Sequence, residues 1–246
     1  MHLLVLALIV TMVNLMLWQI RRLHDRQGTN HKVEQASRMA PVSLDEITAL
    51  VGDRGAAAMR YRRVAFAGTY DAQHEVTIAN RSFEGAPGRW VATPLVPTGG
   101  GPAVLVVRGW VPLSVGQDDL RPVKGIEPPS GDVIVEGYVD PAQTRGRFGP
   151  TDPPTGTLAE LSRVDVARIA KQTGPMSKDF FVQLVAQEPM APKAPSPVPP
   201  PPPDEGPHRG YAGQWAIFTL IAVVGYPVLL RRKAHSLREA ALPASN

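Results

Sequence analysis

The sequence predicts a membrane protein of the α+β class, with two transmembrane helices, one at each end, flanking an extracytoplasmic antiparallel β-sheet or small barrel with a few helices. Two observations carry this prediction. Apolar runs of membrane-spanning length lie near the two ends, and the segment between them has the polar composition of a water-soluble domain. In that segment, runs with strand character come first and one amphipathic helix comes late, an order that favours an antiparallel sheet with helices beside it.

The first apolar run, residues 1–20, is predicted to be an uncleaved transmembrane helix. It contains no Asp, Glu, Lys or Arg. A helix of about 20 residues rises about 30 Å, which is the thickness of the hydrocarbon core of a bilayer. A cleaved signal peptide would carry a basic region before the apolar run and a small-residue cleavage site after it, and this run has neither.

The second apolar run, residues 211–230, is predicted to lie in another transmembrane helix over residues 208–230. Arg231, Arg232 and Lys233 follow it, and the positive-inside rule places them in the cytoplasm. Arg21 and Arg22 after the first run argue the opposite way, but the rule is weak when the segment between two spans is long. We therefore expect a two-pass protein of the cell (plasma) membrane, with both termini, including a tail of residues 231–246, in the cytoplasm.

Residues 21–188 are predicted to form the extracytoplasmic α+β domain. Ser43 and Glu46 have the spacing of a capping box and open a short helix that ends near Val51. Residues 162–174 have N-cap and C-cap signals and the apolar stripe of an amphipathic helix. Runs rich in Val, Ile, Thr and aromatic residues predict strands at Arg62–Tyr70, Glu75–Phe83, Arg89–Val96, Ala103–Trp110, Val133–Val139 and Phe180–Glu188.

The strand expected at Ala103–Trp110 is the most apolar of the set. Its residues Val104–Val107 are uninterrupted by any polar residue, which predicts burial on both faces of the sheet. The preceding GGGP, residues 99–102, is typical of a tight turn and joins this strand to the one before it.

Residues 189–207 are predicted to be a Pro-rich linker. Pro, Ala and Ser dominate the composition, and Pro199–Pro203 is an unbroken proline run. Such a segment adopts the extended polyproline conformation at about 3.1 Å per residue. We expect a bare spacer that holds the domain some tens of ångströms from the second span.

The composition excludes several classes of function. The net charge is +4, but Arg and Lys are scattered or gather beside the apolar runs, so the expected partner is the lipid bilayer and no nucleic acid is expected. The chain has no cysteine, which excludes disulfides, a thiolate nucleophile and cysteine-based metal sites. The sequence holds no catalytic signature and no nucleophile–base pair, so we expect that the protein is not an enzyme.

His208, Tyr211 and Trp215 stand at the entry to the second span. Their i, i+3, i+7 spacing places them on one face of a continuous helix. A neutral imidazole can ligate a haem iron while the two aromatic side chains pack against the macrocycle. Without a pair of cysteines, such a haem would be bound non-covalently. The alternative is an ordinary interfacial aromatic belt with a histidine that reaches towards the headgroups.

The string RGWVP at the end of the most apolar strand is the second candidate site. Arg108 must find an anion or carbonyl groups there, and Gly109 permits a close approach of backbone. Trp110 offers a large apolar face with one donor, and Pro112 ends the strand. The functional interpretation is an edge that contacts a partner or ligand. The alternative is a structural arginine that fixes the end of a barrel.

Six motifs occur in order along the chain. The first is WQIRR at the end of the first span, the fourth is VLVVRGWVP, and the last is PHRGYAGQW at the entry to the second span. Together they resemble the Surfeit locus protein 1 family of cytochrome c oxidase assembly factors. The chain departs from the family pattern at Pro207, where Asp is common, and in its longer proline linker. The matching positions include Trp18, Gln19, Arg22, Gly68, Arg81, Arg108, Gly109, Trp110, Pro112, His208, Tyr211 and Trp215.

The resemblance implies an assembly or maturation factor for haem–copper cytochrome c oxidase. It implies a membrane-bound chaperone that helps to deliver haem a to the catalytic subunit, with His208 in the position of the haem-iron ligand and a transient, non-covalent cofactor. The implied partners are cytochrome c oxidase subunits or a respiratory supercomplex. The alternative is a structural accessory subunit that stays bound to the oxidase or supercomplex and holds no haem.

Overall fold

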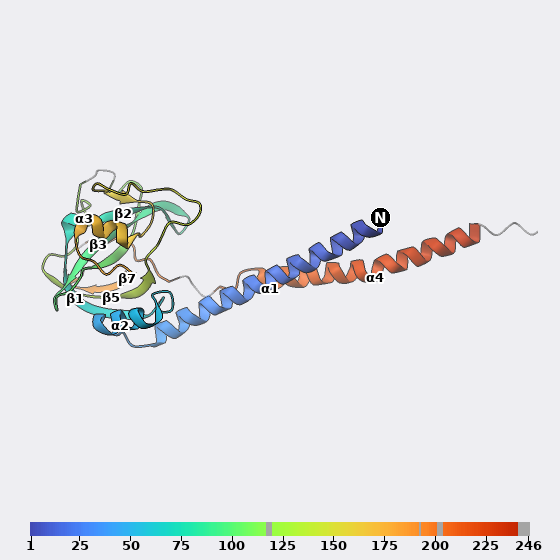
Figure 1. The fold of residues 1–246 in the computed structure, drawn as a ribbon, viewed down its shortest axis with the longest axis horizontal. Coiled ribbons are helices and arrows are strands. Elements are labelled where there is room, and N and C mark those ends of the chain that lie inside the picture. Colours follow the sequence, from blue (N-terminus) through green and yellow to red (C-terminus); the bar gives the residue numbers. More distant parts are fainter. Residues whose placement is uncertain (117–119, 192, 201–203, 241–246) are drawn as a thin grey trace, which may run out of the picture. The chain divides into compact units, whose positions relative to one another are not determined.

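The structure, a computed structural model, describes residues 1–116, 120–191, 193–200 and 204–240 (Figure 1). The chain divides into two compact units. One comprises Met1–His31 together with Pro202–Asn246, and the other comprises Lys32–Pro201. Long helices dominate the first unit, and the second contains the β domain.

Two long helices, α1 (His2–Arg38) and α4 (His208–Ala240), run through the first unit. Both extend beyond the predicted spans because polar residues continue each helix past its apolar run. Their most apolar windows have mean hydropathies of 2.3 and 1.7, so by length and composition both helices can cross a bilayer. Two such helices, one before and one after the β domain in the sequence, fit a two-pass membrane protein.

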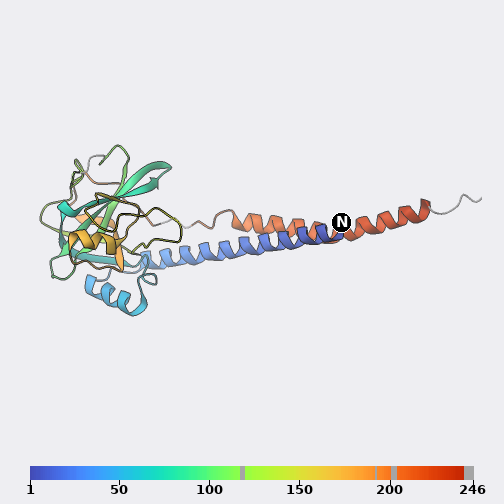
Figure 2. The same cartoon turned by 45° about the horizontal axis from the view of Figure 1, so that its top comes forward.

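The helices α1 and α4 lie side by side and antiparallel (Figures 1 and 2). Tyr226 Oη lies 2.7 Å from His2 Nδ1, and Gln27 Nε2 donates to Glu205 Oε1 at 2.9 Å. The less exposed positions alternate in spacings of four and three, which is the pattern of coiled-coil packing. This seam comprises Val5, Ile9, Met12, Met16, Gln19 and Leu23 of α1 and His208, Ala212, Trp215, Thr219, Ala222 and Tyr226 of α4.

Five strands of the second unit close into a barrel in the order β1-β5-β7-β4-β3, which the pairing of β1 with β3 completes. Two further strands, β2 and β6, extend the sheet beyond β3. The predicted α+β class with a small barrel is therefore confirmed. The strands are β1 (Arg63–Tyr70), β2 (Val76–Phe83), β3 (Ala86–Pro97), β4 (Val104–Pro112), β5 (Asp132–Pro141), β6 (Glu160–Leu161) and β7 (Phe180–Glu188).

One pair of neighbouring barrel strands is parallel. β4 and β7 run in the same direction, while the other four neighbouring pairs of the barrel are antiparallel. A closed barrel with an odd number of strands cannot alternate direction all the way round, so at least one parallel pair is required. A parallel pair needs a long crossover connection. The chain between β4 and β7 supplies it, because it contains β5, β6 and helix α3 (Val166–Thr173).

Strand β4 is buried on both faces, as its apolar sequence predicts. Val104 and Val106 belong to the cluster inside the barrel. Leu105 and Val107 point the other way, into a second cluster that includes Ile169 of α3. The strand thus lies between two hydrophobic cores, and it carries Arg108 directly into the protein interior.

The short helices begin at side-chain caps. Ser43 Oγ accepts from the backbone N–H of Glu46, and α2 (Leu44–Arg54) runs slightly past its predicted end to Gly55. The helix predicted over residues 162–174 begins later, because the side chain of Asp165 accepts from the N–H of Arg168 and starts α3 at Val166. A single 3-10 turn, η1 (Ala72–His74), leads into β2 and was not predicted.

The first part of the Pro-rich linker pairs with the barrel. Ser196 and Trp110 exchange two backbone hydrogen bonds, of 2.7 Å and 2.9 Å, so the chain here runs along β4 instead of leading directly away as a bare spacer. We call residues 189–197 the strap; residue 192 of it lies outside the described residues. Residues 201–203 of the predicted linker and 241–246 of the predicted tail also lie outside them.

Candidate functional site

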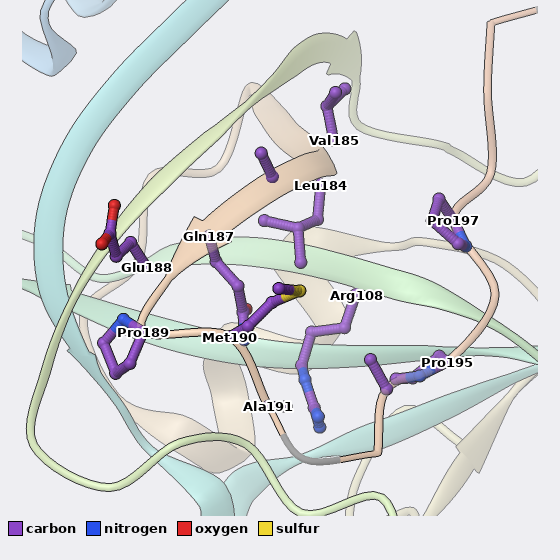
Figure 3. A pocket seen from close by; sticks show the side chains of 12 residues that line it. Arg108, Leu184, Val185, Gln187, Glu188, Pro189, Met190, Ala191, Pro195 and Pro197 are labelled. Carbon is purple, nitrogen blue, oxygen red and sulfur yellow. The ribbon is translucent and has the colours of Figure 1, made fainter.

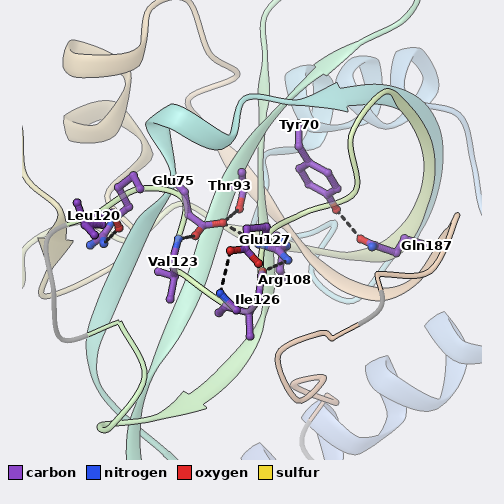
Figure 4. Close-up of polar contacts among 11 residues, drawn as sticks. Tyr70, Glu75, Thr93, Arg108, Leu120, Val123, Ile126, Glu127 and Gln187 are labelled. Carbon is purple, nitrogen blue, oxygen red and sulfur yellow. Dashed lines mark hydrogen bonds and ion pairs between the residues drawn. The ribbon is translucent and has the colours of Figure 1, made fainter.

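Arg108 of β4 forms a buried ion pair with Glu75 at one end of the barrel (Figure 4). Arg108 Nη1 donates to Glu75 Oε2 at 2.7 Å, and the two side chains are 1% and 0% exposed. Arg108 Nη2 donates to the carbonyl oxygen of Ile126 at 2.6 Å. The guanidinium thus finds both the anion and the carbonyl that its position in an apolar strand requires.

The Glu75 carboxylate connects three parts of the domain. Besides Arg108, it accepts from Thr93 Oγ1 of β3 at 2.6 Å and from the backbone N–H of Val123 at 2.8 Å. Val123 and Ile126 lie in the connection between β4 and β5 and pack in a small hydrophobic cluster. A buried charge is tolerated when it is paired and its remaining lone pairs are used. The network therefore fixes this loop onto the end of the barrel.

Tyr70 of β1 lies beside the same network (Figure 4). The guanidinium carbon of Arg108 is 5.8 Å from the centre of its ring, and its hydroxyl donates to Gln187 Oε1 at 2.9 Å. Burial raises the pKa of Tyr70, an effect that the positive charge of Arg108 opposes only in part. The phenol therefore remains protonated and available as a donor at neutral pH.

Gly109 and Trp110 of β4 contact the strap. Gly109 has φ +149°, and a Cβ added there would lie 2.4 Å from the carbonyl oxygen of Ser196. Trp110 supplies the backbone partner of Ser196, while its indole Nε1 donates to the carbonyl oxygen of Arg81 at 3.1 Å. The three residues of the RGW string thus have three roles. Arg108 forms the internal ion pair, Gly109 leaves room for the strap, and Trp110 binds the strap through its backbone.

A pocket of about 670 Å³ lies between the end of β7 and the strap (Figure 3). Leu184, Met190 and Pro195 give it a mainly apolar wall, and Arg108 also contributes to the lining. Glu75 neutralises the charge of Arg108, and Glu188 is the other charged residue of the lining. Its size and lining suit an apolar group of a ligand or partner.

The predicted site at His208 lies between the long helices. His208 Nδ1 is 2.8 Å from Oε1 of Gln19 in α1. His208 is half-buried at the first residue of α4, and Gln19 has an exposed fraction of only 8%. Both stand at the boundary of the apolar runs, since the runs end at Ile20 and begin at Tyr211. The pair therefore lies at one edge of the membrane-spanning region.

The imidazole of His208 could hold a haem iron. One imidazole is present, and the described part of the chain holds no group of three His, Cys, Asp or Glu that could bind a metal without a macrocycle. A Cβ added at Gly206 would lie 3.3 Å from Cδ2 and 3.4 Å from Nε2 of His208, so glycine avoids crowding against this edge of the ring. The Nε2 atom of a neutral imidazole is a donor that haem iron can take from histidine.

Tyr211 and Trp215 take unequal positions. Trp215 is half-buried on the seam that also contains His208, and its ring lies edge-on to Phe218 at 6.0 Å. Tyr211 is 48% exposed beside this seam. The structure thus brings His208 and Trp215 to one seam and leaves Tyr211 at its flank. Their roles in cofactor binding stay predictions.

The other predicted residues have separate structural settings. Trp18 is 51% exposed and Arg22 is also exposed on α1. Gly68 lies where β1 pairs with β3, and a Cβ there would lie 2.4 Å from the backbone carbonyl oxygen of Val96, so only glycine permits this closure. The Arg81 guanidinium lies 4.4 Å from the ring centre of Trp90, and burial lowers its pKa. Pro112 is the exposed last residue of β4.

Glu75 is the site residue that sequence reasoning missed. It stands at the start of a predicted strand, and nothing in its local pattern marks it as a buried partner. The available signal was indirect: an arginine in a fully apolar strand requires a buried acid, but many acidic residues flank the strands of this domain.

Comparison of the sequence with known proteins matches this chain to a family model and to a curated relative. The model of the SURF1 family matches residues 6–220. A curated relative, Surfeit locus protein 1 of Arabidopsis thaliana, is 34% identical over 106 residues. That match covers 39% of this chain and 29% of the length of the plant protein.

Proposed function

We propose that this chain, which belongs to the SURF1 family, is an assembly factor for haem–copper cytochrome c oxidase that helps to deliver haem a to the catalytic subunit. The observation that carries the proposal is the placement of His208 at the edge of the paired membrane helices, held by Gln19. A factor of this kind needs no catalytic machinery, since its task is to hold and hand over a cofactor.

The geometry suits transient binding. Haem a would supply the redox chemistry of the oxidase, and His208 would hold it here through its imidazole. A single non-covalent ligand from one chain permits release, whereas covalent attachment would not. The position at the membrane edge is also where a cofactor with an apolar body and polar propionates can sit with both parts solvated.

Haem retention tests the proposal. The full chain is purified in mild detergent from cells that make haem a, and absorbance spectra are compared for wild type, His208→Ala and the control His24→Ala. His24 is an exposed histidine of α1. We expect a haem a spectrum in wild type and in the control, and its loss in His208→Ala. Absence of haem a from wild type, or its full retention in His208→Ala, would contradict haem delivery through this site.

A second candidate function is a stable accessory subunit of the oxidase or of a respiratory supercomplex. The apolar pocket by the strap favours it, because Met190 at that pocket is 83% exposed and Val185 is 47% exposed. Recovery of the chain on an affinity-tagged oxidase subunit separates the two roles. Recovery in a one-to-one ratio with the mature enzyme supports the accessory subunit, and recovery with immature forms alone supports the assembly factor.

A further inference from the structure

The most buried side chain of the first span is polar. Within Met1–His31, all of which the structure describes, Gln19 alone is buried, while apolar residues such as Leu4 and Leu6 are 72% and 58% exposed. An amide removed from water is costly unless it is hydrogen-bonded, and polar side chains of membrane helices commonly bond across to a second helix. Gln19 does so, and its partner is His208.

The contact with Gln19 favours hydrogen on one of the two ring nitrogens of His208. Oε1 of Gln19 is a carbonyl oxygen and can only accept, so His208 Nδ1 must be the donor across the 2.8 Å separation. A neutral imidazole carries one N–H. With that hydrogen on Nδ1, Nε2 presents its lone pair. Nε2 is also the nitrogen beside Gly206, where a Cβ would come within 3.4 Å of it.

We propose that Gln19 is a positioning residue that fixes His208 in the Nδ1–H tautomer and orients its Nε2 towards the iron of haem a. This inference rests on the proposed function. Metal-binding histidines generally donate their other ring N–H to a carbonyl or carboxylate, which fixes the tautomer and makes the ligand nitrogen more basic. Here the acceptor comes from the other end of the chain, so the ligand is set only when α1 and α4 are paired.

Three variants of the full chain in lipid nanodiscs test the role of Gln19. Gln19→Leu keeps the approximate size and removes the acceptor, whereas Gln19→Glu keeps an acceptor. Asn14→Leu is the matched control, because Asn14 is an exposed polar residue of the same helix whose amide donates to the carbonyl of Val10 at 2.8 Å. Two properties are measured: the ¹⁵N shifts of the His208 ring nitrogens without haem, and the affinity for added haem a by absorbance.

We expect wild type, Gln19→Glu and Asn14→Leu to show a protonated Nδ1 and an unprotonated Nε2. Gln19→Leu is expected to show a mixture of tautomers and a haem a affinity lower by about 10- to 100-fold, the usual effect of removing such a partner. A wild-type His208 that carries its proton on Nε2 would overturn the inference, whether or not haem binds. Equal haem affinity in wild type and Gln19→Leu would overturn it as well.

The two measurements separate this inference from the proposed function. If wild type shows the Nδ1–H tautomer but binds no haem a, the proposed haem delivery is refuted. The Gln19–His208 contact then exists, but it does not position a haem ligand. If wild type binds haem a and the affinity falls in His208→Ala but not in Gln19→Leu, the proposed function stands and the role of Gln19 is refuted.

Discussion

Arg108→Leu is expected to destabilise the β domain severely. The side chain removed is 1% exposed, and its loss leaves the Glu75 carboxylate in the interior with only Thr93 and Val123 as donors. The carbonyl of Ile126 also loses its donor. Removing one partner of a buried ion pair costs about 3–5 kcal/mol. Because a domain is stable by only about 5–15 kcal/mol, this loss is a large part of the free energy of unfolding.

A double-mutant cycle isolates the contribution of the pair. Glu75→Gln keeps the shape of the side chain but leaves Arg108 as an unpaired buried charge. The double variant Glu75→Gln with Arg108→Leu buries neither charge. We therefore expect its cost to fall short of the sum of the two single costs by about 1–3 kcal/mol, the coupling typical of residues in one network.

Urea unfolding of the full chain in detergent, followed by tryptophan fluorescence, measures these costs. Arg38→Leu is the control, because Arg38 pairs with Glu34 but is 77% exposed on its side chain. Its effect is expected to stay within about 0.5 kcal/mol. A cost for Arg108→Leu as small as that of the control, or strict additivity in the cycle, would refute the argument that the RGW arginine stabilises the barrel end through Glu75.

Two further predictions follow from the domain. Gly109→Ala is expected to displace the strap, because the added Cβ would lie 2.4 Å from the carbonyl oxygen of Ser196. Hydrogen exchange at the Trp110 amide, which donates to that oxygen, should then become faster. The control Gly99→Ala adds a Cβ in open space and should leave this exchange unchanged. Burial raises the pKa of Asp140 despite its hydrogen bond with Arg60, so the folded state binds the proton of this carboxyl more tightly than the unfolded state. The contribution of Asp140 to stability is then greatest below its unfolded pKa of about 4 and is lost as the pH rises through its folded pKa. Asp140→Asn should flatten this fall in a plot of Tm against pH, and an unchanged profile would contradict the assignment.

Local sequence predicts the secondary structure well. The strand expected at Phe180–Glu188 has those bounds in β7, and the strand expected at Arg62–Tyr70 differs from β1 by one residue. The turn at residues 99–102 joins an antiparallel pair, as expected. Each of these features depends on residues that are neighbours in the chain, so composition and spacing suffice to identify it.

Contacts between distant residues could not be predicted in the same way. Glu75 and Arg108 are 33 residues apart, and Gln19 and His208 are 189 apart. The need of Arg108 for an acid follows from its apolar surroundings, but which acid meets it depends on how the barrel closes. The strap was missed because Ser196 pairs through backbone groups, which no pattern of side chains in a proline-rich segment reveals.

The strand β7, which pairs in parallel with β4, is the last strand of the barrel in the sequence. β7 is the last strand to leave the ribosome, yet it fills the gap between β5 and β4, both made earlier. Until it arrives, the nascent sheet has two unpaired edges, which are prone to association with other chains. The strand that closes the barrel is followed directly by the strap and then by α4. The strand that closes the barrel is therefore synthesised shortly before α4, and a chain truncated before Phe180 would keep α1 but have an open, aggregation-prone sheet.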